Sequence, residues 1–196
     1  MKVHFIRSGE RRYGMRIERV SGPTLVMDPA PGFDADLPHD MVHLVVEAAL
    51  GLKGGLFGQL AAGGDGGTFH VEVTDGKAAA KDRRRAARRT AAQGRKLANG
   101  QGRDGELSEL AAFCFDIEWR RRSRPDSAAQ RAALGEADRT RQSLGIEERA
   151  RFDAAAPRIF DAFAELSAAW RGLRVGEALT VEWPSLRRAN PGQPIG

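Results

Sequence analysis

Two patterns of apolar residues divide this chain, and they constrain its fold more than any other feature. Near both ends, apolar side chains alternate with polar ones, so that Val3 shares a face with Phe5 and Leu179 shares a face with Val181. A period of two is typical of strands that bury one face. Over residues 107–170 apolar side chains recur at helical spacing instead. The sequence therefore predicts an α+β fold, in which a small antiparallel sheet from the N-terminal strands and the C-terminal strand packs with a bundle of helices.

Turn-forming residues separate these patterns into individual elements. Asp36 is a suitable N-cap for a helix that ends before Gly51, and Pro157 is expected to kink or divide the last long helix. The expected elements are a hairpin (2–7 and 11–20), a strand (24–27), a helix (39–50), a short helix (54–62), a strand (69–73), helical segments from residue 77 to residue 170, and a closing strand (179–183).

The length of 196 residues is enough for one ordinary domain or two small ones. We expect a single domain over residues 1–184, with a flexible basic middle segment at about 75–104 and a tail over 185–196. The one cysteine, Cys114, cannot close an intramolecular disulfide. No apolar run approaches the roughly 18 to 20 residues that a membrane helix needs. These features predict a cytoplasmic protein that does not enter the membrane.

The charges are distributed unevenly along the chain. Thirty-one Lys and Arg against 26 Asp and Glu give a net charge of +5, yet no basic residue occurs between Arg19 and Lys53. Residues 77–103 carry ten basic residues and one acidic residue, Asp82. This segment could bind the phosphates of nucleic acid or an acidic partner, although it holds no aromatic residue for stacking on bases. A non-enzymatic interaction module is therefore one candidate function, and a solvated helix face or linker is the simpler interpretation of the same segment.

The helix expected at residues 39–50 carries an unusual polar stripe. His39 and His43 lie one turn apart, Glu47 follows one turn later, and Asp40 falls in the same sector, with no Lys or Arg among them. Two imidazoles at this spacing can bind one ion, and a carboxylate can complete a three-ligand site that leaves a position for water. The predicted ligands are His39, His43 and Glu47. Zinc is the favoured metal, and iron, manganese and nickel remain open.

Such a metal would activate a water molecule or polarise a substrate oxygen, and Asp40 or Glu47 would orient the water or move its proton. The predicted function is therefore that of a divalent-metal-binding protein. If it is an enzyme, it is a metal-dependent hydrolase or lyase acting on a small molecule that the sequence does not identify. A solvated or hydrogen-bonded polar face without any ligand is the alternative, because an amphipathic helix also needs a hydrated side. His4 and His70 fall on expected strands, where a lone histidine is more often structural.

The segment that begins at Leu37 reads Leu-Pro-His-Asp-Met-Val-His and carries three resemblances. Its His-Asp-x-x-His pattern is similar to the H-E-x-x-H helix of zinc metallohydrolases, with Asp40 in place of the glutamate general base. It also resembles the zinc motif of a ubiquinone-biosynthesis protein family, whose additional glutamate corresponds to Gly55 here. Residues 37–52 further resemble uncharacterised bacterial proteins with Leu-Pro-His-Asp-x-Val-His. The zinc helices imply a metal site at His39 and His43, whereas the bacterial proteins imply no activity.

Overall fold

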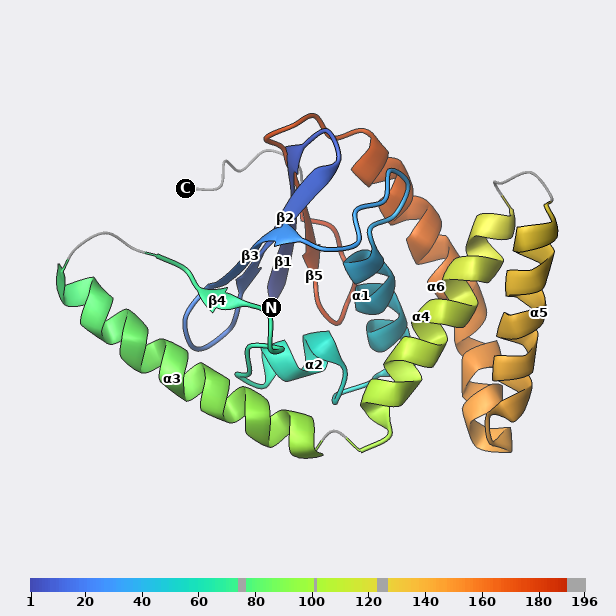
Figure 1. Ribbon diagram of the computed structural model, residues 1–196, viewed down its shortest axis with the longest axis horizontal. Coiled ribbons are helices and arrows are strands. Elements are labelled where there is room, and N and C mark those ends of the chain that lie inside the picture. Colours follow the sequence, from blue (N-terminus) through green and yellow to red (C-terminus); the bar gives the residue numbers. More distant parts are fainter. Residues whose placement is uncertain (74–76, 101, 123–126, 190–196) are drawn as a thin grey trace.

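One antiparallel sheet forms the frame of the molecule (Figure 1). A computed structural model describes residues 1–73, 77–100, 102–122 and 127–189. The C-terminal strand pairs with the N-terminal one, with Val3 opposite Val181, so the predicted α+β class and the return of the last strand are confirmed. In the order β4-β3-β2-β1-β5, the strands are β1 (Lys2–Gly9), β2 (Arg12–Glu18), β3 (Leu25–Ala30), β4 (His70–Val71) and β5 (Ala178–Glu182).

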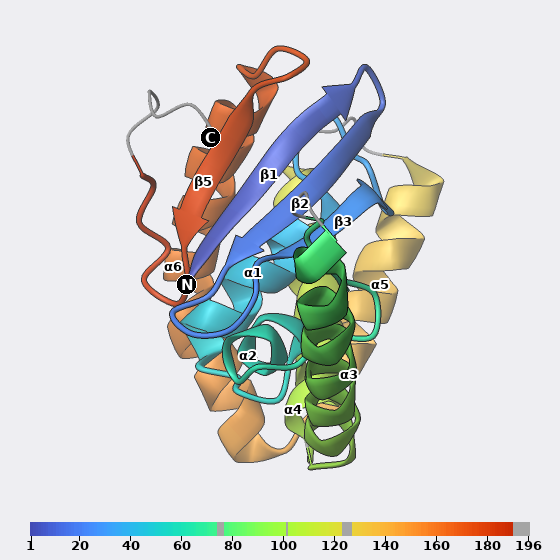
Figure 2. The same ribbon diagram turned by 90° about the vertical axis from the view of Figure 1, so that its left-hand side faces the viewer.

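The alternating residues of these strands bury one face of the sheet. Val3 and Phe5 on β1, and Met15 and Ile17 on β2, are almost completely inaccessible to solvent. Figure 2 faces the opposite side of the sheet and shows α1 and α6 behind the strands. Burial of this apolar face against helices is the main stabilising contribution to the fold.

Six helices complete the described structure. Helix α1 is central, because it packs against α2, α4 and α6. The helix α6 continues through Pro157, so the expected division at that residue does not occur. The helices are α1 (His39–Leu50), α2 (Leu56–Ala61), α3 (Lys77–Gly100), α4 (Asp104–Arg121), α5 (Ala128–Ser143) and α6 (Ile146–Arg171). None of the described helices is both long enough and apolar enough to cross a membrane.

The start of α1 differs from the sequence prediction. Pro38, rather than Asp36, occupies the N-cap position. Asp34 instead accepts hydrogen bonds from the backbone N–H groups of Asp36 and Leu37, at 2.8 and 3.0 Å. The carboxylate that organises this entry therefore acts on the loop before the helix, two residues earlier than expected.

Two other segments, the basic middle segment and the expected tail, also contact the rest of the fold. Residues 77–100 of the middle segment form helix α3, as the helical spacing from residue 77 predicts, and α3 contacts α2 and β4. In the expected tail, Arg188 forms an antiparallel β-bridge with Val181, and the N–H of Ala189 donates to the carbonyl of Thr180. The chain therefore continues along β5. The strand expected at 69–73 is observed only as β4 at His70–Val71. The rest of the tail, residues 190–196, lies outside the described residues, as does the start of the expected middle segment at residues 75–76.

Candidate metal centre

The polar residues of α1 lie on a helix that is buried on almost every side. All residues of α1 except His39 and Ala49 are buried, including Asp40, His43 and Glu47. A buried polar group without a hydrogen-bond partner costs about 1–3 kcal/mol. The stripe is therefore not a hydrated face, and each of its buried members has a specific partner.

His39 and His43 face each other and meet a carboxylate from α4. Their Nε2 atoms lie 3.1 Å apart, and Oε2 of Glu109 lies 3.7 Å from Nε2 of His43. One ligand atom from each of the three residues lies within 4.8 Å of the others. Ligand atoms of a tetrahedral zinc ion with bonds near 2.1 Å are about 3.4 Å apart. Small side-chain movements would bring all three atoms to that geometry.

Hydrogen bonding orients His43 so that Nε2 points at this group. The hydroxyl of Ser108 donates to Glu47 at 2.9 Å, so it accepts the proton of His43 Nδ1, which also lies at 2.9 Å. Nε2 of His43 then carries the lone pair that a metal requires. Burial, followed by the neighbouring His39, lowers the pKa of His43 to about 4, which keeps the imidazole neutral at ordinary pH.

Glu47, the third ligand expected from the sequence, lies outside the metal-ligand group. Its two carboxylate oxygens accept hydrogen bonds from the N–H groups of Leu56 and Phe57, both at 2.8 Å, and from Gly58 at 3.4 Å. With the bond from Ser108, four donors converge on it. Burial nevertheless raises the pKa of Glu47 to about 7. The structure thus uses Glu47 to hold the start of α2 and to anchor Ser108.

Two glycines allow the chain to return to Glu47 directly after α1. Gly51 ends α1 in the left-handed conformation, at φ 62°, and is followed by a backbone bond from Leu52 to the carbonyl of Glu47. A Cβ atom at Gly55 would lie 2.3 Å from the carboxylate carbon of Glu47. The position at which the resembling zinc family carries a glutamate therefore has no room for a side chain in this protein.

Asp40, which was expected to orient the water or move its proton, is hydrogen-bonded to a residue of the sheet. Its Oδ2 accepts a very short hydrogen bond from the hydroxyl of Tyr13 on β2. The same hydroxyl lies 2.7 Å from the carbonyl oxygen of Pro31. Burial raises the pKa of Asp40 above its ordinary value, against the lowering effects of Tyr13 and His39. Asp40 does not belong to the ligand group, but it lines the cavity beside it.

Helix α4 supplies Ser108 and Glu109, the two site residues that the sequence patterns did not single out. The carboxylate of Asp104, at the start of α4, accepts the N–H groups of Lys53 and Gly54 at 2.8 and 2.9 Å. This tether fixes the first turns of α4 against α1 and so places Ser108 and Glu109 opposite His43. Ser108 lies among the buried residues of α4, and a polar residue on an apolar helix stripe was the one available signal.

A cavity of about 520 Å³ opens beside these residues. His39, Asp40, His43, Ser108 and Glu109 all line it, together with apolar side chains such as Met27 and Leu56. A volume in this range accommodates a small molecule. The cavity therefore places the ligand group where a substrate could reach it.

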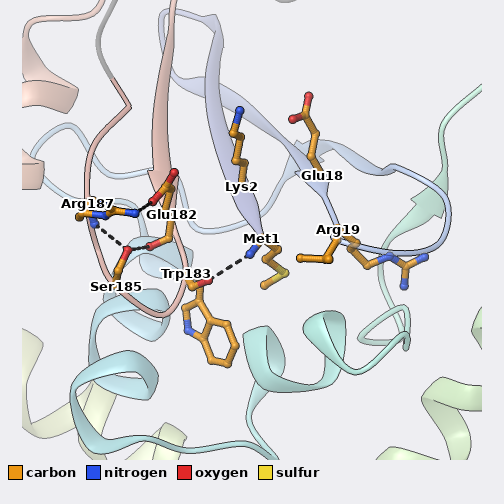
Figure 3. A pocket seen from close by; sticks show the side chains of 9 residues that line it. Met1, Lys2, Glu18, Arg19, Glu182, Trp183, Ser185 and Arg187 are labelled. Carbon is orange, nitrogen blue, oxygen red and sulfur yellow. Dashed lines mark hydrogen bonds and ion pairs between the residues drawn. The ribbon is translucent and has the colours of Figure 1, made fainter.

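A second cavity, of about 500 Å³, lies at the end of β1 and β5 (Figure 3). Two of its charged groups have partners within the cavity wall: Arg187 pairs with Glu182 at 2.8 Å, and the amino group of Met1 donates to the carbonyl of Trp183 at 3.1 Å. The described residues that line it include no histidine or cysteine. Among the described residues, the group that could hold a metal therefore lies at α1 and α4.

The remaining histidines and carboxylates considered from the sequence lie elsewhere. His4 contacts Thr180 at 2.9 Å, and His70 is exposed on β4, so neither joins the His39–His43 pair. Asp116 bonds Arg120 at 2.8 Å and Glu118 bonds Arg141 at 3.1 Å. These groups serve ion pairs that hold the helices.

No protein-family model matches this chain, and comparisons with curated proteins and with solved structures found no significant match. No family can therefore be assigned, and the resemblance of the segment that begins at Leu37 to zinc helices stays a prediction. The geometry around α1 is the remaining guide to function.

Proposed function

We propose that this protein binds one divalent metal ion through His39, His43 and Glu109. The observation that carries the proposal is the convergence of two imidazole nitrogens and one carboxylate oxygen within 4.8 Å. Two histidines and a carboxylate, with a fourth position open to water, are the donors of many catalytic zinc sites. Zinc is the favoured ion, and iron, manganese and nickel accept the same donors.

The surroundings of His43 support this assignment. A metal-binding histidine usually donates its other N–H to a fixed acceptor, which sets the tautomer and the ring orientation. Ser108 provides that acceptor, and Glu47 holds Ser108. Glu47 is therefore assigned as a positioning residue that acts through Ser108, and Glu109 takes its place among the ligands.

The metal would polarise a bound water or a substrate oxygen, which suits a hydrolytic or lyase-like reaction. Asp40 lines the same cavity and would orient the water or accept its proton. The substrate would be a small molecule that fits a cavity of about 520 Å³. A reducing compartment such as the cytoplasm belongs to this proposal, because Cys114 is buried and free.

Elemental analysis of untagged protein, purified without chelator and then offered zinc, tests the proposal. Wild type should hold about one metal ion per chain, and the double variant His39→Ala/His43→Ala should hold none. Glu109→Gln should weaken binding, because it replaces the charged ligand.

His70→Ala is the matched control, since His70 is an exposed histidine outside the ligand group. It should retain the metal. A wild-type protein that binds no zinc in a titration, or a His70→Ala variant that loses metal as fully as the double variant, would refute the assignment.

A further inference from the structure

Helix α3 carries a long cationic stripe that the metal site does not use. The residues of the stripe occupy an arc of about 140° and extend along roughly 22 Å of helix, at 1.5 Å per residue. All of them are exposed: Lys81, Arg84, Arg85, Arg88, Arg89, Arg95 and Lys96. Five of the stripe residues also line a common hollow of about 760 Å³ on the surface of α3.

Several arginines elsewhere in the molecule form ion pairs, unlike these cations. Elsewhere Arg16 pairs with Glu72 at 2.8 Å, and Arg103 pairs with Glu148 at 2.9 Å. Within the described part of the chain, no ion pair involves any of the seven stripe residues. The fold therefore does not neutralise the positive charge of α3.

Packing of the opposite side of α3 leaves the stripe accessible. Thr90 and Gly94 are buried on that inner side, and Asp65 lies so close to Gly94 that a Cβ there would be 2.4 Å from its carboxylate. In Figure 1, α3 runs along the lower left edge of the molecule, and in Figure 2 it is the helix nearest the viewer. Asp82 is the one acidic residue of α3, and it lies beside the stripe.

We propose that α3 is a docking surface for the phosphate backbone of double-stranded nucleic acid. A duplex carries one negative charge per about 1.7 Å of its axis with both strands counted, so a 22 Å length of duplex carries roughly 13 phosphates, and those on its near side would face the seven cations. Arginine suits this partner because its guanidinium binds phosphate oxygens in pairs. The absence of any aromatic residue from α3 favours backbone contacts without sequence selection, rather than stacking on single strands.

An anionic membrane surface fits α3 less well. An interfacial helix needs large apolar side chains next to its cationic face. Leu97 is the only large apolar residue of α3, and it is half-buried. The remaining apolar residues of this helix are alanines, which contribute little insertion energy. The charge pattern thus favours a rigid polyanion in water.

Fluorescence anisotropy with a labelled 20-base-pair duplex of random sequence, titrated at several salt concentrations, tests this surface. Each phosphate contact adds about 0.9 to the slope of log affinity against log salt. The variant Arg84→Ala/Arg85→Ala/Arg88→Ala/Arg89→Ala should reduce that slope by about 3 to 4 and weaken binding accordingly. Alanine favours the helix, so α3 should persist and circular dichroism should be unchanged.

A control of equal charge removes four exposed cations from other elements and loops: Arg11→Ala/Lys53→Ala/Arg139→Ala/Arg158→Ala. It should keep most of the affinity and slope. The His39→Ala/His43→Ala variant should bind the duplex like wild type, which separates this surface from the metal site. Equal losses in the two charge variants would overturn the proposal. Tighter binding to phosphatidylserine vesicles, or equal binding to a polyglutamate peptide, would do so as well.

Discussion

Helices α1 and α3 both carry polar side chains, but their surroundings are opposite. In α1, Glu47 is completely buried and four hydrogen-bond donors surround its carboxylate. In α3, Arg88 and Arg89 are exposed and make no ion pair within the described residues. A buried polar group must be partnered to avoid a cost of about 1–3 kcal/mol, whereas an exposed cation is solvated at no such cost.

The comparison separates two kinds of functional evidence. The polar residues of α1 are informative because they are buried and each has a specific hydrogen-bond partner, and this geometry supports the proposed metal site. The cations of the α3 stripe are informative because they make no ion pair with any residue that the structure describes, so their charge remains available to another molecule. Each helix therefore yields a different test of what its polar residues do.

The largest expected effect comes from removing the buried carboxylate of α1. Glu47→Ala leaves three backbone N–H groups and the hydroxyl of Ser108 without an acceptor and opens a cavity, so it should destabilise the protein by about 3–5 kcal/mol. Chemical denaturation measures this. The four-alanine variant of α3 described above should change stability by less than about 0.5 kcal/mol. Similar losses in both variants would break the contrast between the two helices.

An intermediate effect is expected at Gly55, where the chain touches Glu47. Gly55→Ala introduces a Cβ 2.3 Å from the carboxylate carbon, and this overpacking should cost about 1–3 kcal/mol. Gly100→Ala, at the end of α3, is the matched control because nothing lies within 4 Å of its added Cβ. It should be neutral or slightly stabilising in the same denaturation experiment. Equal behaviour of the two variants would show that Glu47 tolerates displacement.

Among the three substitutions around α1, the smallest change in stability is expected for Ser108→Ala, which should lose about 1–2 kcal/mol. Its informative result is metal affinity, measured by zinc titration. Because Ser108 holds the Nδ1 side of His43, its loss should weaken zinc binding about 10- to 100-fold while the ligands stay in place. Ser143→Ala, an exposed serine of α5, should leave both quantities unchanged. Unchanged zinc affinity in Ser108→Ala would contradict the positioning role.

Much of the fold could be predicted because it depends on local periodicity. The β1–β2 hairpin and the return of β5 to β1 follow from alternating patterns. Gly51 ends α1 as predicted, because glycine readily adopts the left-handed conformation found there. Sequence was less informative for α3, where an Ala- and Arg-rich composition fits both a helix and a linker. Packing against α2 and β4 is a tertiary effect that composition does not encode.

For the candidate site, local spacing placed His39 beside His43, since residues four apart are neighbours on any helix. The same spacing put Glu47 on their face but could not show that the chain turns after Gly51 and brings α2 onto its carboxylate. Nor could it bring in Ser108, which lies 65 residues from His43 in the chain. Contacts over such separations depend on how α4 packs on α1. Local residue spacing shows which face of a helix is apolar but not which other helix packs against it.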